Sequence, residues 1–257
     1  MCYRNSIIIK IVLFTAFVWL CLTSTILAWD SLPAEILNRT LFIKVGDVTG
    51  TAFAIDYKGK LYFVTARHVV AKSPKSNAII QVRLSDKWIN LQTIKTLFPP
   101  SVEADIAVFE TGEKIPEPFK FTTIGKPGDI LMGQQGWFLG YPWGIGSHFK
   151  NDKGKTIPFI KKGTMSAVDW TNPDAVVLYI DGFNNPGFSG GPIVFENLNS
   201  HTLEIIGVVK GYKEDTAKVL VNGKHLDTEL LVNSGILIGY SIEHALQAID
   251  KSQEKQP

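Results

Sequence analysis

Cysteine is nearly absent from this chain. Of its 257 residues only Cys2 and Cys21 are cysteines, and both lie within the first 28 positions. The remaining sequence therefore has no disulfide, no thiol nucleophile and no thiolate metal ligand. Its histidines show no metal-ligand spacing, and it contains no glycine-rich phosphate loop or dinucleotide fingerprint. The sequence implies neither a metal ion nor a cofactor.

An excess of either charge is also lacking. The chain has 26 Lys and Arg residues against 24 Asp and Glu residues. Arg4 and Lys10 lie in the first 28 positions, where no acidic residue occurs, so residues 29–257 contain 24 of each sign. A nucleic-acid partner requires a concentrated basic face, and this balance argues against one.

Long hydrophobic runs are confined to the N-terminus. Residues 11–28 are apolar and uncharged, and they follow a short basic segment. This order predicts a secretory signal in residues 1–28, or an uncleaved membrane anchor formed by residues 11–28. A lipid anchor at Cys21 is disfavoured, because Leu20 stands where a small residue is needed. In either case we expect residues 29–257 to be exported, to the periplasm or the medium.

Helical periodicity is scarce after this segment. Short runs rich in Val, Ile, Phe and Tyr alternate with turn residues, which predicts an all-β protein built as a sandwich or as barrels. Only two helical stretches are expected, a single turn near residues 68–72 and a C-terminal helix over residues 241–251. The lysine-rich residues 144–163 are interpreted as a solvated loop. The expected strands are residues 41–46, 50–55, 60–66, 78–84, 88–94, 105–110, 137–142, 175–181, 191–195, 203–209 and 236–242.

Two candidate catalytic residues stand at strand ends. His68 follows the apolar residues 60–66, so its ring would lie at a rim that solvent and a substrate can reach. Asp105 leads into the apolar residues 106–109, and a partly buried carboxylate there needs a partner such as a histidine nitrogen. Each residue taken alone is more typical of a structural histidine or a turn residue.

The strongest signal is the sequence NPGFSGGP at residues 185–192. Gly187 permits the unusual backbone conformation that turns an amide towards a substrate oxygen, and Ser189 lies in the tight bend. Gly190 and Gly191 permit close approach of the substrate and of neighbouring backbone. The alternative, an ordinary glycine-rich turn, is disfavoured once the other two motifs are counted.

Together, TARHV around His68, DIAVF around Asp105 and GFSGGP around Ser189 resemble the chymotrypsin-like, or trypsin-like, serine protease family. The chain order His, Asp, Ser is that of this family, and it differs from the orders in α/β-hydrolases and subtilisins. GYPWG at residues 140–144 and KGTMSAV at residues 162–168 resemble its bacterial Deg-like branch. We expect no peptide-binding PDZ domain.

The resemblance implies a fold and a domain division. A trypsin-like protease domain would occupy residues 29–257. It would contain two six-stranded antiparallel β-barrels, at about residues 40–115 and 120–240, with the active site in the cleft between them. The helix at residues 241–251 would follow the second barrel.

The resemblance also implies an activity, that of an endopeptidase acting on polypeptides. Ser189 would attack the peptide carbonyl, His68 would accept and return its proton, and Asp105 would hold the His68 tautomer. The backbone amides of Gly187 and Ser189 would form the oxyanion hole. Phe188 stands where the digestive enzymes have an aspartate that pairs with a new N-terminal amine, so we expect no such activation switch.

The resemblance also implies a substrate pocket. Its floor would lie near Phe183, six residues before Ser189, and a wall would lie near Val209, Lys210 and Gly211. No aspartate occupies the floor position, so a small or apolar side chain is expected there rather than Arg or Lys. A Lys210 side chain facing the pocket would favour acidic side chains instead.

Two other functions stay open at this stage. One is a catalytically latent or non-catalytic peptide-binding or sensing protein on the same fold. The other is an esterase or acyl transferase that uses the same three residues. The sequence assigns neither the natural substrate nor the oligomeric state.

Overall fold

The first barrel is complete within the residues that the structure describes. The computed structural model describes residues 31–74, 76–84, 87–111, 123–148 and 156–254. Six antiparallel strands close in the order β1-β2-β3-β6-β5-β4. Alternating apolar side chains such as Ile43, Phe63 and Phe109 fill the interior. The strands are β1 (Thr40–Val45), β2 (Val48–Tyr57), β3 (Lys60–Thr65), β4 (Ile79–Leu84), β5 (Lys87–Leu97) and β6 (Ala107–Thr111).

A second ring of six antiparallel strands follows. Their order is β13-β8-β11-β12-β15-β14, and β14 pairs back with β13. The expected pair of six-stranded barrels is thus confirmed. A seventh strand, β7 (Thr123–Ile124), pairs with β14 in parallel, which the sequence did not indicate. The six strands are β8 (Gln135–Gly140), β11 (Phe159–Asp169), β12 (Val177–Asp181), β13 (Pro192–Asn197), β14 (Thr202–Val221) and β15 (Lys224–Ser241).

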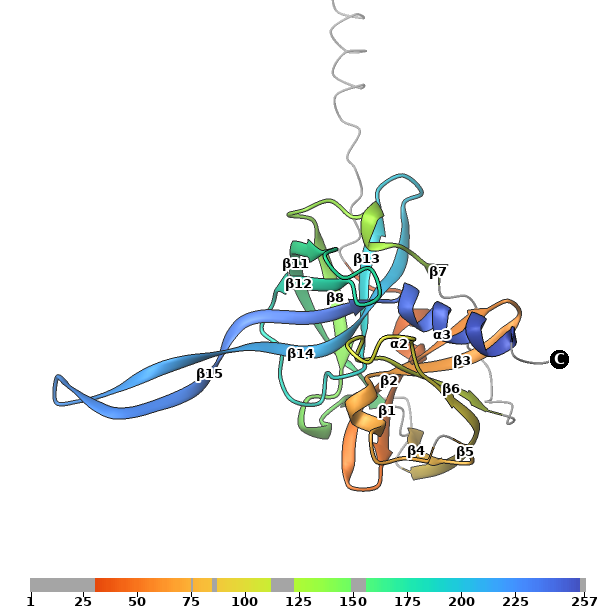
Figure 1. Cartoon of the computed structure of the whole chain (residues 1–257), viewed down its shortest axis with the longest axis horizontal. Helices are drawn as coiled ribbons and strands as arrows, with labels where there is room; N and C mark the ends of the chain where they lie inside the picture. Colours follow the sequence, from red (N-terminus) through yellow and green to blue (C-terminus); the bar gives the residue numbers. More distant parts are fainter. Residues whose placement is uncertain (1–30, 75, 85–86, 112–122, 149–155, 255–257) are drawn as a thin grey trace, which may run out of the picture. The chain divides into compact units, whose positions relative to one another are not determined.

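Strands β14 and β15 are much longer than expected. The sequence predicted residues 203–209 and 236–242, but the two strands continue to a turn at residues 222–223. Beyond the barrel they pair only with each other, from Glu214↔Asn233 to Val221↔Lys224. We call residues 212–235 the distal ribbon, and Figure 1 shows it extending beyond the second barrel.

Two further expectations are wrong. Part of the segment interpreted as a solvated loop is regular structure, since β9 (Ser147–His148) pairs with β10 (Thr156–Ile157) and β11 begins at Phe159. The count of two helical stretches is also too low. Besides η1 (Arg67–Val70) and the C-terminal α3 (Glu243–Gln253), the chain forms the helices α2 (Ala34–Arg39), η2 (Pro127–Asp129) and η3 (Pro142–Gly144).

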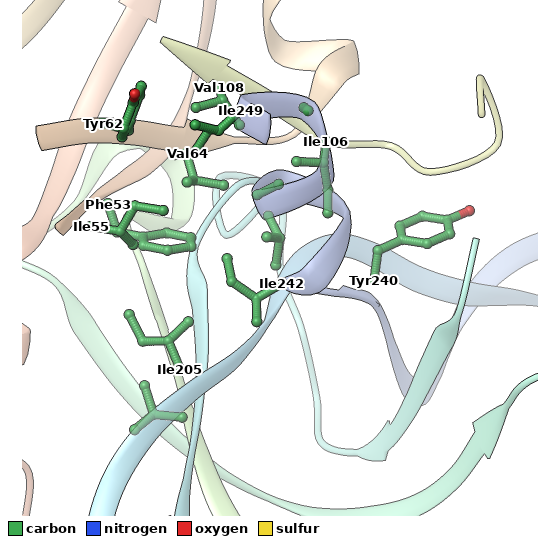
Figure 2. Close-up of a cluster of buried hydrophobic side chains, with 14 of the residues drawn as sticks. Phe53, Ile55, Tyr62, Val64, Ile106, Val108, Ile205, Tyr240, Ile242 and Ile249 are labelled. Atoms are coloured by element: carbon green, nitrogen blue, oxygen red, sulfur yellow. The ribbon is translucent and has the colours of Figure 1, made fainter. Parts of the chain in front are cut away.

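One apolar core joins the two barrels and α3 (Figure 2). The first barrel contributes Phe53 and Val64, and the second contributes Ile205. Helix α3 contributes Ile249, which is fully buried, and Ile242 just before the helix is fully buried too. Burial of side chains from all three parts holds the barrels in a fixed relation to each other.

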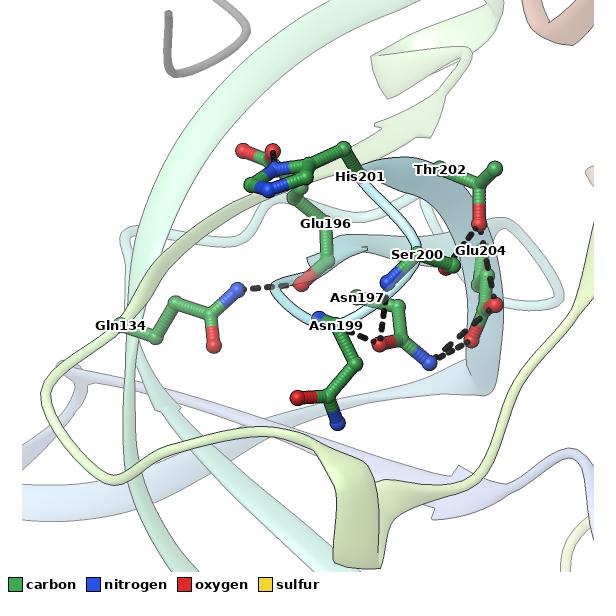
Figure 3. A network of polar contacts seen from close by, with 8 residues as sticks. All are labelled: Gln134, Glu196, Asn197, Asn199, Ser200, His201, Thr202 and Glu204. Atoms are coloured by element: carbon green, nitrogen blue, oxygen red, sulfur yellow. Dashed lines mark hydrogen bonds and ion pairs between the residues drawn. The ribbon is translucent and has the colours of Figure 1, made fainter. Parts of the chain in front are cut away.

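The turn between β13 and β14 is held by a polar network (Figure 3). Glu204 is buried and accepts hydrogen bonds from Asn197 Nδ2 at 3.2 and 3.3 Å and from Thr202 Oγ1 at 3.2 Å. Gln134 Nε2 donates to the carbonyl oxygen of Glu196 at 2.6 Å. The network thus closes the end of β13 that lies farther from the serine motif.

The predicted signal or anchor at residues 1–28 lies outside the described residues and stays a prediction. Among the described residues, every helix is too short or too polar to cross a lipid bilayer.

Candidate active site

His68 and Asp105 are brought together by the first barrel. Strand β3 ends at Thr65 and passes into η1, which contains His68. Asp105 lies just before β6, and its carboxylate accepts twice from the same residue. Oδ1 is 2.9 Å from the backbone nitrogen of His68, and Oδ2 is 2.6 Å from its Nδ1. The His68 side chain is 47% exposed and that of Asp105 is 14% exposed, so Asp105 orients a ring whose Nε2 edge remains available to a substrate.

The serine motif forms a bend with two unused amides. Gly187 has a φ of +104°, and a Cβ at this position would lie 3.0 Å from both Pro142 Cα and Trp143 N. Only glycine fits this conformation without strain. Trp143 N donates to the carbonyl oxygen of Pro186 at 3.0 Å and so holds that carbonyl in place. Within the described part of the chain, neither the Gly187 nor the Ser189 amide donates a hydrogen bond. Two such amides are the donors of an oxyanion hole.

The Ser189 hydroxyl points to the second barrel rather than to His68. Its Oγ donates to the carbonyl oxygen of Lys210 at 3.0 Å, and no hydrogen bond joins it to His68 among the described residues. The segment that carries His68 nevertheless lies close to the serine bend. A Cβ on Gly50 would lie 2.9 Å from Val69, the residue after His68, and 3.2 Å from the Ser189 carbonyl oxygen.

Thr51 ties the serine bend to the first barrel, a role that the sequence did not indicate. This fully buried residue of β2 donates its Oγ1 to the carbonyl oxygen of Gly187 at 2.7 Å and accepts from Tyr141 N at 3.1 Å. Its backbone nitrogen donates to the carbonyl oxygen of Ser189 at 2.9 Å. A threonine on an apolar strand carries no sequence signal of this kind.

Lys161 is a second residue that the sequence did not single out. From β11 its Nζ donates to the carbonyl oxygen of Phe183 at 2.7 Å and to Asn185 Oδ1 at 2.6 Å. The ammonium also lies 5.4 Å from the ring centroid of Phe188, which is fully buried. Burial lowers the pKa of Lys161. The ammonium group therefore braces the three residues that lead into Ser189.

The expected pocket residues occupy different environments. Phe183 is 56% exposed, whereas Val209 is fully buried in the second barrel, so the Val209 side chain is core rather than pocket wall. Lys210 is exposed, and its Nζ lies 5.8 Å from the ring centroid of Tyr240. Burial, together with the charge of Asp105, raises the pKa of Tyr240. Gly211 is half-buried beside Lys210.

Comparisons with known proteins agree with this geometry. A sequence profile of the trypsin-like peptidase domain matches residues 50–200, more than half of the chain. No protein of curated function matches in sequence.

Among solved structures, the inactive form of Rv3671c from M. tuberculosis H37Rv is 18% identical, with a TM-score of 0.54 over 87% of this chain and 91% of that one. The HtrA-type protease AlgW with a bound tripeptide, in a serine-to-alanine variant, is 20% identical. Its TM-score is also 0.54, over 86% of this chain and 64% of that one, so this chain spans less than two thirds of AlgW. At these identities the structures show a common fold. The profile match, over more than half of the chain, shows that the chain belongs to the trypsin-like peptidase family and is a serine endopeptidase.

Proposed function

We propose that the chain hydrolyses peptide bonds through His68, Asp105 and Ser189 and an acyl-enzyme intermediate. The observation that carries this is the pair of hydrogen bonds, at 2.9 and 2.6 Å, that fix His68 against Asp105. His68 Nε2 removes the proton of Ser189 Oγ as the oxygen attacks the substrate carbonyl, and it then gives a proton to the leaving amine. Water repeats the sequence on the acyl-enzyme and releases the second product.

The amides of Gly187 and Ser189 stabilise the negative charge that develops on the carbonyl oxygen. Each such donor is worth roughly 3–4 kcal/mol of the barrier. In the resting arrangement the Ser189 hydroxyl donates to the carbonyl oxygen of Lys210, so this bond breaks and the hydroxyl turns to His68 before attack. Catalytic hydrogen bonds are often absent from free enzymes and form with the substrate.

Covalent labelling tests the role of Ser189. The full chain, treated with a fluorophosphonate, is expected to gain a single adduct by intact mass, because only an activated serine reacts. Ser189→Ala is expected to gain none and to keep its fold by circular dichroism. Ser166→Ala, which removes an exposed serine on β11, is the matched control and keeps the adduct. A folded wild-type chain without an adduct would overturn the proposal and favour a latent or peptide-binding protein.

We extend the proposal to specificity, where a small or apolar side chain enters the pocket. The expected floor residue, Phe183, carries no carboxylate, and its carbonyl oxygen accepts a hydrogen bond from Lys161 Nζ. A cationic side chain would therefore meet no opposite charge at the floor. Profiling with a peptide library is expected to give cleavage after small or apolar residues. Cleavage mainly after Arg or Lys would contradict this, and hydrolysis of esters but not peptides would favour an esterase.

A further inference from the structure

The distal ribbon has two open edges in the described part of the chain. In the barrel, β14 pairs with β13 from Thr202 to Val208, and β15 pairs with β12 from Ile236 to Tyr240. From Glu214↔Asn233 to Val221↔Lys224, β14 and β15 pair only with each other among the described strands. An isolated two-stranded hairpin is marginally stable in water, and its open edges are templates for another strand.

The distal ribbon also carries apolar side chains on both faces. Leu231, 72% exposed, pairs with Thr216, and Leu230, 55% exposed, pairs with the adjacent Ala217. Successive residues of a strand point to opposite faces, so neither face packs on the barrel. Apolar side chains gathered at such density on a surface mark an interaction site. The exposed large apolar residues of the ribbon are Leu220, Val221, Leu226, Leu230, Leu231 and Val232.

The charges on β14 favour pairing of its outer edge with the same edge of a second copy of this chain. Residues 214–218 are a regular run without a bulge. When two copies pair antiparallel about a two-fold axis perpendicular to the sheet, the residue on the axis lies directly opposite the same residue of the other copy. The rotation leaves each side chain on its own face of the sheet. Centred on Thr216, this pairing sets Glu214 opposite Lys218 of the second copy, twice by symmetry. Directly opposed charges of opposite sign stabilise strand pairs.

The outer edge of β15 is less suited to the same contact. Two-fold pairings centred on Asp227, Thr228 or Glu229 each set carboxylates directly opposite one another, and such like-charge pairs destabilise a sheet. Pairings centred on Leu230 or Leu231 bring no charges of opposite sign together. We propose that two copies of this chain associate through the β14 edges of their distal ribbons, in an antiparallel pairing centred on Thr216, to form a four-stranded sheet.

Cysteine cross-linking tests the pairing in the full chain. Cys2 and Cys21 are replaced by serine, and Thr216→Cys is added. Because residue 216 faces its own copy, the two Cα atoms would lie about 4.5–5.5 Å apart, which suits a disulfide. Mild oxidation is expected to give a disulfide-linked dimer by intact mass. In the matched control, Ala217→Cys, the cysteine faces Asp215 of the second copy, and no disulfide-linked dimer is expected. Equal cross-linking at both positions would overturn the register.

Charge exchange tests the partner contacts. In the Thr216→Cys chain, Glu214→Lys or Lys218→Glu is expected to lower the initial cross-linking rate about 5- to 100-fold, because two attractive pairs become repulsive. The double exchange restores the rate, as does a mixture of the two single variants. Cross-linking rates that neither substitution changes would overturn the proposal. They would favour a different protein as the partner of the ribbon. The Ser189 labelling result is independent of this outcome.

Discussion

At the scale of single residues, two side chains outside the proposed triad hold the serine bend in place. Thr51 Oγ1 donates to the carbonyl oxygen of Gly187 and accepts from the backbone nitrogen of Tyr141. Lys161 holds the carbonyl of Phe183 and the amide of Asn185. The buried ring of Phe188 packs against Phe138 and lies beneath the Lys161 ammonium. The Lys161 ammonium thus holds the bend before Ser189 in place.

Lys161→Met is expected to lower kcat about 10- to 100-fold with little change in KM. Loss of the ammonium frees the carbonyl of Phe183 and loosens the bend, which costs less than the loss of an oxyanion donor. The measurement is steady-state hydrolysis of a peptide that the wild-type chain cleaves, with the fluorophosphonate labelling rate beside it. Lys162→Met is the matched control, because Lys162 is exposed and lies over Trp137 on the same strand.

A purely structural Lys161 would give a different result. The variant would then unfold at a lower temperature, while its folded fraction kept the wild-type kcat. Lys161→Arg retains the positive charge, and partial recovery of kcat in it would support positioning by that charge.

At the scale of elements, the sequence predicted the barrel strands because their apolar residues alternate and face a core. The expected strand at residues 50–55 falls within β2, and the one expected at residues 60–66 corresponds to β3, which ends one residue earlier. Both contribute to the core of the first barrel and to the core shared with the second barrel and α3. His68 and Asp105 were placed correctly as neighbours of strand ends. Their mutual contact could not be read from spacing, since it depends on the closure of the barrel around them.

The distal ribbon was missed for a physical reason. Its residues mix charged and apolar types without a buried face, so the alternation that marks a half-buried strand is weak. One signal was present, because Asn222-Gly223 is a typical hairpin turn and both residues have positive φ, +49° and +77°. The ribbon also reaches the site, since Asn233 Nδ2 donates to the carbonyl oxygen of Asn184 at 2.6 Å. Pairing of two ribbons would therefore stiffen the residues that border the pocket.

At the scale of the whole molecule, we expect the two barrels to unfold as one unit, because they share a core. The cluster of Figure 2 contains side chains from the first barrel, the second barrel and α3. Helix α3 is tied to β2 as well, where Tyr57 Oη donates to Asp250 at 3.1 Å and Lys58 Nζ lies 2.7 Å from the same carboxylate. A destabilising substitution in α3 should therefore lower the stability of both barrels.

Ile249→Ala is expected to lower the free energy of unfolding by about 2–5 kcal/mol in a single transition, because a fully buried side chain leaves a cavity. Urea unfolding followed by tryptophan fluorescence and by circular dichroism measures it. Ile94→Ala, at a side chain that is 53% exposed, is the control and should change stability by less than about 0.5 kcal/mol. Two separate transitions, of which Ile249→Ala shifts only one, would show that the barrels unfold independently.

Because the residues of the site come from both barrels, the site forms only after both barrels have been synthesised and have folded. His68 and Asp105 belong to the first barrel, Ser189 and its amides to the second, and α3 adds its share of the common core last in the chain. A ribosome makes the chain in that order, N-terminal part first. In the proposed mechanism, a partly made chain would hold a base without a nucleophile, and then a nucleophile before α3 has joined the common core. We expect such a chain to lack peptidase activity until both barrels and α3 have packed together.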